Sequence, residues 1–105
     1  MDITHKTSPE GGFFIAEEGG QRMGYLSYEW ADDTVFAIMH TVVDKAFQGR
    51  GIAKALLDAA VAFARENGYK VRLICPYAEK VFKRDPSYAG DVVYVTPSPT
   101  TGPWV

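Results

Sequence analysis

The sequence is poor in the residue types that build disulfide scaffolds, zinc sites and nucleic-acid interfaces. Its 105 residues include one cysteine and two histidines, too few for an intramolecular disulfide or for the ligand spacing of a structural zinc site. Eleven lysines and arginines stand against 13 aspartates and glutamates, and they form no basic block. We therefore expect no metal and no nucleic-acid partner.

Long hydrophobic runs are absent as well. No segment approaches the roughly 20 apolar residues of a membrane span. The N-terminus lacks the basic stretch followed by an apolar one that is typical of a signal peptide. A single cysteine is typical of a reducing compartment. These features predict a cytoplasmic protein that does not bind membranes.

What the sequence does contain is enough for one domain. With 47% hydrophobic residues, a chain of this length can bury a core of its own. The composition changes only near the C-terminus, where residues 96–103 are rich in proline and threonine. We predict a single domain over residues 1–93 and a Pro/Thr-rich C-terminal tail over residues 94–105.

Hydrophobic periodicity predicts an α/β fold (α+β by some schemes). The pattern indicates two strands joined as a hairpin, a third strand, a long helix, a fourth strand, a short helix and a last short strand, at residues 13–17, 22–30, 35–43, 51–67, 69–75, 76–84 and 91–95. The third strand is apolar on both faces, so we expect it at the centre of the sheet with helices on both sides. It should run parallel to the fourth strand, because a helical crossover joins the two.

The turn before the long helix has the features of an anion-binding loop. The segment Gln48-Gly49-Arg50-Gly51-Ile52-Ala53 lies between an apolar strand and a helix N-terminus, whose unpaired N–H groups attract phosphate. Glycines at 49 and 51 let the backbone approach an anion, and Arg50 can add a charged contact. The residues fit neither a Walker A loop nor the dinucleotide fingerprint. The alternative is that the two glycines only shape the turn.

These residues resemble the acyl-CoA pyrophosphate loop of the GNAT N-acetyltransferase superfamily. The family pattern is Gln or Arg, two residues, Gly, one residue, then Gly or Ala, and Gln48, Gly51 and Ala53 match it. The chain is also similar to a family of very small GNAT-like proteins, on the segments His40-Thr41-Val42-Val43, Cys75-Pro76-Tyr77 and Asp85-Pro86-Ser87-Tyr88. The likeness implies a GNAT-like mixed sheet, in which antiparallel N-terminal strands lead into a parallel, splayed β-α-β-α unit.

The resemblance implies acetyl-CoA as the cosubstrate. In GNAT proteins the pantetheine arm of CoA lies between the strand before the loop and the strand after the long helix. The backbone of Val42 and Val43 would then hold the arm and face the thioester. The pyrophosphate would bind the amides of the loop, namely those of Gln48, Gly49, Arg50, Gly51, Ile52 and Ala53.

The proton donor of larger GNAT enzymes is missing from its usual place. Their pattern has a tyrosine where this chain has Phe82, which cannot donate a proton. Cys75, between a strand and a helix N-terminus, is a candidate replacement, with His40 as a base or ion-pair partner and Tyr77 as a spare donor. Two catalytic routes stay open: an acetyl-Cys75 intermediate, or direct attack by an amine with Cys75 as the acid. The plainer alternative is that Cys75 and His40 are structural.

The acceptor is the least defined part of this prediction. Only residues 18–21 join the first two predicted strands, so the helices that wall the acceptor site in larger relatives are missing, and this side should be open. An open side suits a bulky acceptor such as a protein or peptide amine. We predict an acetyl-CoA-dependent N-acetyltransferase that is a monomer or a weak homo-oligomer. The alternative is a non-catalytic acyl-CoA-binding module, acting as a sensor or a complex subunit.

Overall fold

The computed structural model describes residues 1–88, 90 and 92–94. Within these residues the chain forms, in order, β1 (Asp2–Ser8), β2 (Gly11–Glu18), β3 (Gln21–Asp32), β4 (Val35–Val43), the 3-10 helix η1 (Lys45–Phe47), α1 (Ile52–Asn67), β5 (Lys70–Leu73), α2 (Pro76–Arg84), the 3-10 helix η2 (Pro86–Tyr88) and β6 (Val92–Tyr94). Of the predicted tail, only Tyr94 falls within this range.

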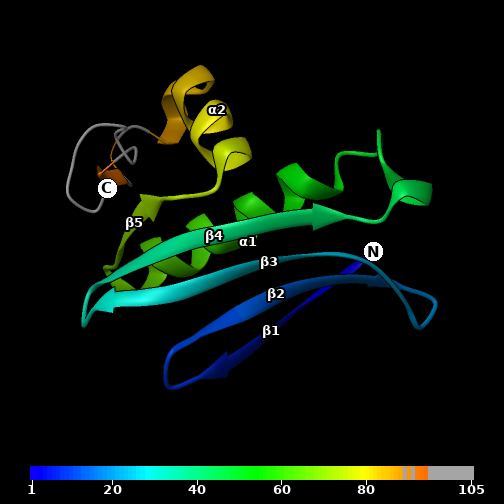
Figure 1. Ribbon diagram of the computed structural model, residues 1–105, viewed down its shortest axis with the longest axis horizontal. Coiled ribbons are helices and arrows are strands. Elements are labelled where there is room, and N and C mark those ends of the chain that lie inside the picture. The colour runs from blue at the N-terminus through cyan, green and yellow to red at the C-terminus, as the bar shows by residue number, and fades with distance from the viewer. Residues whose placement is uncertain (89, 91, 95–105) are drawn as a thin grey trace.

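The strands form one mixed sheet whose spatial order follows the chain, from β1 to β6 (Figure 1). The strands from β1 to β4 each pair with the next in antiparallel orientation, whereas β4, β5 and β6 run parallel to one another. This arrangement confirms the predicted antiparallel strands followed by a β-α-β-α unit. The first strand, β1, was not predicted, because only Ile3 and His5 on its inner side are half-buried and the rest is exposed and polar.

The long helix α1 forms where its apolar positions recur with helical spacing. Its buried residues all lie on one side, and they are Ile52, Leu56, Leu57, Ala60, Val61 and Ala64. The helix ends at Gly68, which has a φ of 75° and donates its N–H to the Ala64 carbonyl, a common left-handed C-terminal cap. The predicted bounds of this helix are confirmed to within one residue.

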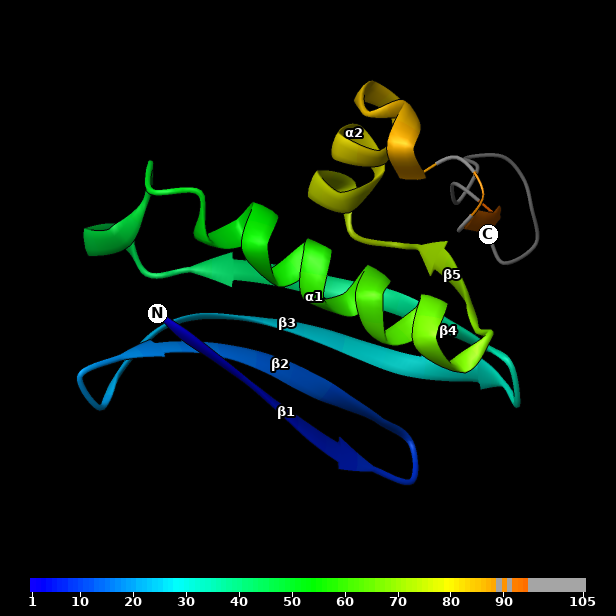
Figure 2. The same cartoon turned by 180° about the vertical axis from the view of Figure 1, so that it is seen from behind.

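Both helices pack on the same face of the sheet (Figure 2). Leu57 of α1 and Phe82 of α2 join one core cluster with Phe36 of β4. Ala37, on the other face of β4, is also buried but stands outside that cluster. The prediction of helices on both sides was therefore wrong. A small residue such as Ala37 is covered by its own sheet, because β3 and β5 flank it in register.

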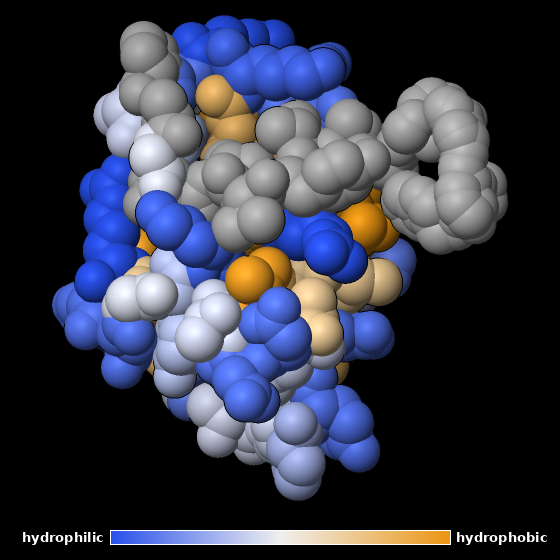
Figure 3. Space-filling view, turned by 90° about the vertical axis from the view of Figure 1, so that its left-hand side faces the viewer, coloured by the Kyte–Doolittle hydropathy of each residue, from blue (hydrophilic) through white to orange (hydrophobic). Residues whose placement is uncertain are grey.

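Hydrophobic side chains are gathered inside this two-layer arrangement. The end of the molecule drawn in Figure 3 is mostly hydrophilic, and hydrophobic residues reach its surface only in small patches. Among the described residues, none of the helices combines the length and the apolar character that crossing a membrane requires.

Candidate functional site

β4 and β5 separate half-way along β4. Their parallel pairing ends where Ile38 faces Leu73, and the N–H groups of Ile74 and Cys75 both donate to the Ile38 carbonyl, at 3.1 and 2.9 Å. Residues 40–43 still pair with β3, but within the described part of the chain no strand pairs with their other edge. This free edge of β4 can hydrogen-bond an extended ligand in the manner of an added strand.

A bulge at Met39 decides which side chains of β4 face the helices. Tyr28 of β3 pairs with Ile38 and Ser27 with His40, so Met39 has no partner on β3. Strict alternation from Ile38 would place His40 on the helix face. The extra residue reverses the alternation, so Thr41 lies on the helix face and His40 on the opposite face.

A hollow of about 450 Å³ opens on the helix face beside the free edge of β4. We call it the helix-side hollow, and it is lined by Thr41, Val43, Phe47, Gln48, Gly49, Gly51, Ile52, Ala53, Lys54 and Tyr77. The hollow thus joins the second half of β4 to the N-terminus of α1. Six of the eight predicted cofactor residues line it directly, and only Val42 and Arg50 do not.

The loop at the mouth of this hollow is shaped for close approach. Gly49 and Gly51 have φ values of 85° and 78°, and a Cβ added to either would meet nothing within 4 Å. The first helical hydrogen bond runs from the Ala55 N–H to the Gly51 carbonyl, at 3.0 Å. The N–H groups of residues 52–54 therefore precede the helical ladder and are available to an anion.

The side chains of the same loop fold away from its tip. The Gln48 amide donates to the Val43 carbonyl at 3.4 Å. The Arg50 guanidinium lies 5.3 Å from the centre of the Phe47 ring, and Arg50 does not line the helix-side hollow. Backbone groups, rather than these side chains, are thus what the loop presents to the hollow.

Cys75 and His40 are not brought together. Cys75 is the N-cap of α2 and only 4% exposed, and its Sγ lies 3.6 Å from Thr41 Oγ1, to which the thiol can donate. His40 is exposed and lines a second hollow, of about 310 Å³, on the sheet face opposite α1 and α2. The partner that the structure gives the thiol is therefore Thr41, next to His40 in the chain but on the other face.

Sequence reasoning missed two residues of the site. Thr41 is a polar residue in an apolar strand, and that contrast could have drawn attention to it. Lys54 is a cation in the first turn of α1, where the helix dipole disfavours positive charge, and it lines the helix-side hollow. Tyr77, which was considered as a spare donor, lines the same hollow and is 37% exposed.

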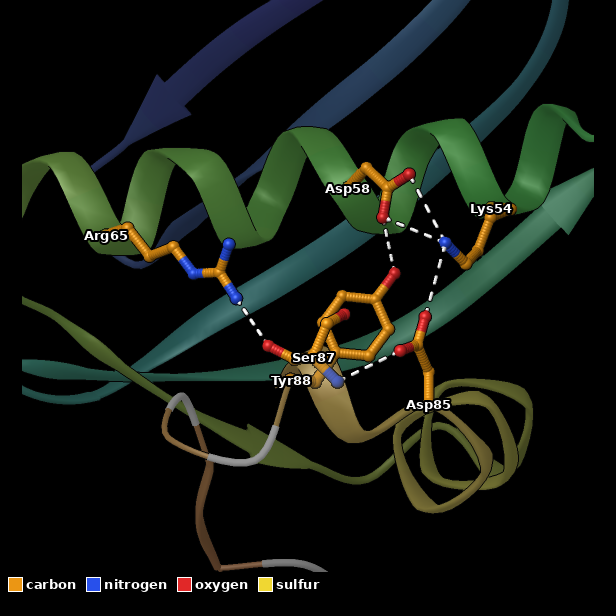
Figure 4. A network of polar contacts seen from close by, with 6 residues as sticks. All are labelled: Lys54, Asp58, Arg65, Asp85, Ser87 and Tyr88. Atoms are coloured by element: carbon orange, nitrogen blue, oxygen red, sulfur yellow. Dashed lines mark hydrogen bonds and ion pairs between the residues drawn. The ribbon is translucent and has the colours of Figure 1, made fainter.

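Lys54 belongs to a polar network that fastens η2 to α1 (Figure 4). Its ammonium is 3.3 Å from Asp58 and 3.9 Å from Asp85. A hydrogen bond to Tyr88, and to a smaller extent one to Asp58, raises the pKa of Lys54. The Tyr88 hydroxyl also donates to Asp58. The network keeps Lys54 charged at the edge of the helix-side hollow.

Comparison with known proteins identifies the family. Residues 12–92 match the family model described as GCN5-related N-acetyl-transferase. The chain belongs to this family. Protein NATD1 of Xenopus tropicalis is 38% identical to this member over 74 residues, which are 70% of this chain and 68% of the relative.

Solved structures agree with the assignment. A GCN5-like protein from Staphylococcus aureus is 27% identical with a TM-score of 0.64, and the match covers 91% of both chains. A GNAT family acetyltransferase from Elizabethkingia anophelis, solved with acetyl-CoA bound, is 24% identical with a TM-score of 0.54 over 59% of this chain and 41% of that one, and supports the fold alone. The predicted GNAT-type N-acetyltransferase class is thus confirmed, with His40, the loop and Cys75 all inside the matched residues.

Proposed function

We propose that this GCN5-related protein transfers the acetyl group of acetyl-CoA directly to an amine acceptor. The observation that carries the proposal is the helix-side hollow, which joins the free edge of β4 to the anion-binding loop of α1. Acetyl-CoA supplies an activated acetyl group as a thioester, and the amine takes it with release of the CoA thiol.

The hollow supports the following placement of acetyl-CoA. The pyrophosphate lies on the backbone amides of the loop, which are those of Gln48, Gly49, Arg50, Gly51, Ile52 and Ala53. The backbone of Val42 and Val43, on the free edge of β4, holds the pantetheine arm. Lys54 adds a positive charge beside the phosphates. The open space at Gly49 and Gly51 supports this fit, since no side chain stands between the backbone and an anion.

The amine and the leaving CoA thiol lie on opposite faces of β4 in this proposal. The amine approaches from the sheet face opposite α1 and α2, where exposed His40 accepts the proton that its nitrogen loses. A backbone N–H on the free edge of β4 donates to the carbonyl oxygen while negative charge develops there. On the helix face, Cys75 supplies a proton to the departing CoA sulfur through the Thr41 hydroxyl, which accepts from the thiol and lines the hollow, with Tyr77 as the alternative donor.

A route through acetyl-Cys75 is the second candidate, and the burial of the thiol argues against it. At 4% exposure, with Thr41 as its partner, the sulfur is poorly placed to attack a ligand carbon. A cysteine nucleophile is usually partially exposed in electropositive surroundings. A non-catalytic acyl-CoA-binding module is the alternative function, and it predicts binding without turnover.

The first experiment is native mass spectrometry of the protein with acetyl-CoA, followed by denaturation and peptide mapping. Direct transfer predicts a bound acetyl-CoA species and no acetyl mass on the Cys75 peptide. A covalent acetyl group on that peptide would favour the two-step route. If no acetyl-CoA binds, the loop is only a turn and the proposal is wrong.

Cysteine variants separate the routes by rate. Under direct transfer, Cys75→Ala keeps measurable acetylation because water or Tyr77 can supply the proton, whereas a two-step mechanism loses it entirely. Thr41→Val is the matched control, since it changes the partner of the thiol and keeps the sulfur. Transfer abolished in Cys75→Ala, with acetyl-CoA still bound, contradicts the direct route.

The cellular setting is part of the same proposal. We infer a cytoplasmic monomer or weak homo-oligomer, with one domain over residues 1–93 and neither nucleic acid nor membrane as a partner. The composition supports this, through its single cysteine and balanced charge. Truncation after Val93 should leave acetyl-CoA binding intact, and loss of binding would move the domain boundary.

A further inference from the structure

We propose that the hollow on the sheet face opposite α1 and α2 is the acceptor site and selects a short-chain diamine. This inference rests on the proposed function and deepens it by naming the substrate class. We call the feature the sheet-face hollow; its volume is about 310 Å³, and it is lined by Ser8, Glu10, Gly11, Gly12, Phe13, Tyr25, Ser27, Tyr28, Glu29, Met39 and His40.

The sheet register places His40 and the Glu29 carboxylate at two different points along this hollow. Ser27 pairs with His40, and Glu29 pairs with Gly11 and Ala37. Two residues along a strand span roughly 7 Å. Two amino groups on one short alkyl chain can therefore occupy both positions at once, one beside His40 and one beside Glu29.

The charge of the lining favours a second cation at the far position. Glu10 and Glu29 are acidic, and no lysine or arginine lines the hollow. In the part of the chain that the structure describes, neither carboxylate has an ion-pair partner. An ammonium group placed between them gains charge-assisted hydrogen bonds that a neutral group does not.

Aromatic and apolar groups suit the chain that joins the two amines. Phe13 is 46% exposed and packs edge-on against Tyr25, with the ring centres 5.9 Å apart. Lys6 pairs with Phe13 on β1, and Arg22 lies over the Tyr25 ring, but neither lines the hollow. Methylene groups can bury against these rings while both amines stay polar at the two ends.

The transfer step is balanced for such a substrate. One amine, in its neutral form, forms the new C–N bond to the acetyl carbon, and the C–S bond of the thioester breaks. The proton lost by the nitrogen passes to His40, and the CoA sulfur takes up a proton. The second amine remains an ammonium group between Glu10 and Glu29 throughout.

The test compares putrescine with butylamine, which has the same chain and only one amino group. We expect a kcat/KM for putrescine several-fold higher than for butylamine, since exposed charge pairs contribute a few-fold each. Glu29→Gln and Glu10→Gln should each reduce this preference by roughly threefold, and high salt should reduce it in the intact protein. Glu66→Gln, at the exposed end of α1, is the matched control and should change nothing.

A titration without acetyl-CoA gives an independent readout. Adding putrescine should shift the amide resonances of Phe13, Ser27 and Glu29, whereas butylamine should shift them much less. Equal rates for the two amines, or a preference that survives Glu29→Gln, overturns the diamine inference. Acetylation of a lysine peptide but not of putrescine also overturns it and leaves the proposed function standing. Absence of acetyl-CoA binding overturns both.

Discussion

At the scale of single residues, His5 shows how the core holds the edge strand β1. Its ring stacks on Phe14 with centroids 4.1 Å apart and meets Phe63 edge-on at 4.5 Å. Its Nε2 lies 2.7 Å from the Tyr28 hydroxyl. Desolvation among these rings lowers the pKa of His5, because the charged imidazolium loses water there. The folded protein therefore favours neutral His5.

This burial predicts a pH dependence of stability between neutral pH and the lowered pKa of His5. As the pH falls below about 6.5, the unfolded chain takes up the His5 proton before the folded one, so stability falls through the folded pKa. Urea unfolding at about pH 7.5 and about pH 5.5 should show less stability at the lower pH. His5→Phe keeps the ring and should reduce this difference; an unchanged difference would assign it to other groups.

His40, exposed on the opposite face, has a proposed role in transfer but none in the core. His40→Gln should leave acetyl-CoA binding and the free energy of unfolding nearly unchanged, because the side chain is exposed. Its kcat should fall on the order of 10²–10⁴-fold, the usual contribution of a general base. Steady-state kinetics with calorimetry checks both expectations. A kcat within a few-fold of the parent value would assign the proton to water.

At the scale of elements, the loop before α1 can be compared with a turn whose glycine also has a positive φ. Gly51→Ala adds a methyl group at positive φ, which costs about 1 kcal/mol of stability, and places that group where the pyrophosphate is proposed to lie. Gly19→Ala, in the β2–β3 turn with a φ of 61° and equally open space, carries the same strain away from the site. We expect similar losses of stability in the two variants and weaker acetyl-CoA binding in Gly51→Ala alone. Equal affinities, measured by calorimetry, would separate the loop from binding.

Elements with strong periodicity or a loop signature could be predicted from the sequence. The local signals are the apolar rows of α1, the proline at the start of α2 and the loop from Gln48 to Ala53. The structure has each of these elements at the residues that the sequence predicts. The bulge at Met39 could not be predicted, because it exists only in the pairing of β4 with β3. The Cys75–Thr41 contact joins residues 34 positions apart and depends on that bulge. The rule that side chains alternate between the two faces of a strand therefore fails at this bulge, where the candidate site begins.

At the scale of the whole molecule, residues 1–88, 90 and 92–94 place one helical layer on one face of the sheet and no helix on the other. Stability should therefore depend almost entirely on the helix side. Leu57, with no exposed surface, sits in the shared core, and Leu57→Ala should cost about 2–5 kcal/mol. Phe13→Ala, on the open face, should cost under about 1 kcal/mol, as surface substitutions usually do. Urea unfolding of both variants checks this, and similar losses would mean that the open face is covered in solution.

The order of the sheet has a consequence for how the chain folds. Every strand pairs with the strand that precedes it in the sequence, and the first three pairings are hairpins with short connections. Contacts that are close in sequence form quickly, since little loop entropy is lost in closing them. During synthesis each new strand therefore meets an edge that is already present. We expect the β1–β4 meander to form early and the docking of α1 to limit the folding rate, with amide-exchange protection appearing in the hairpins first.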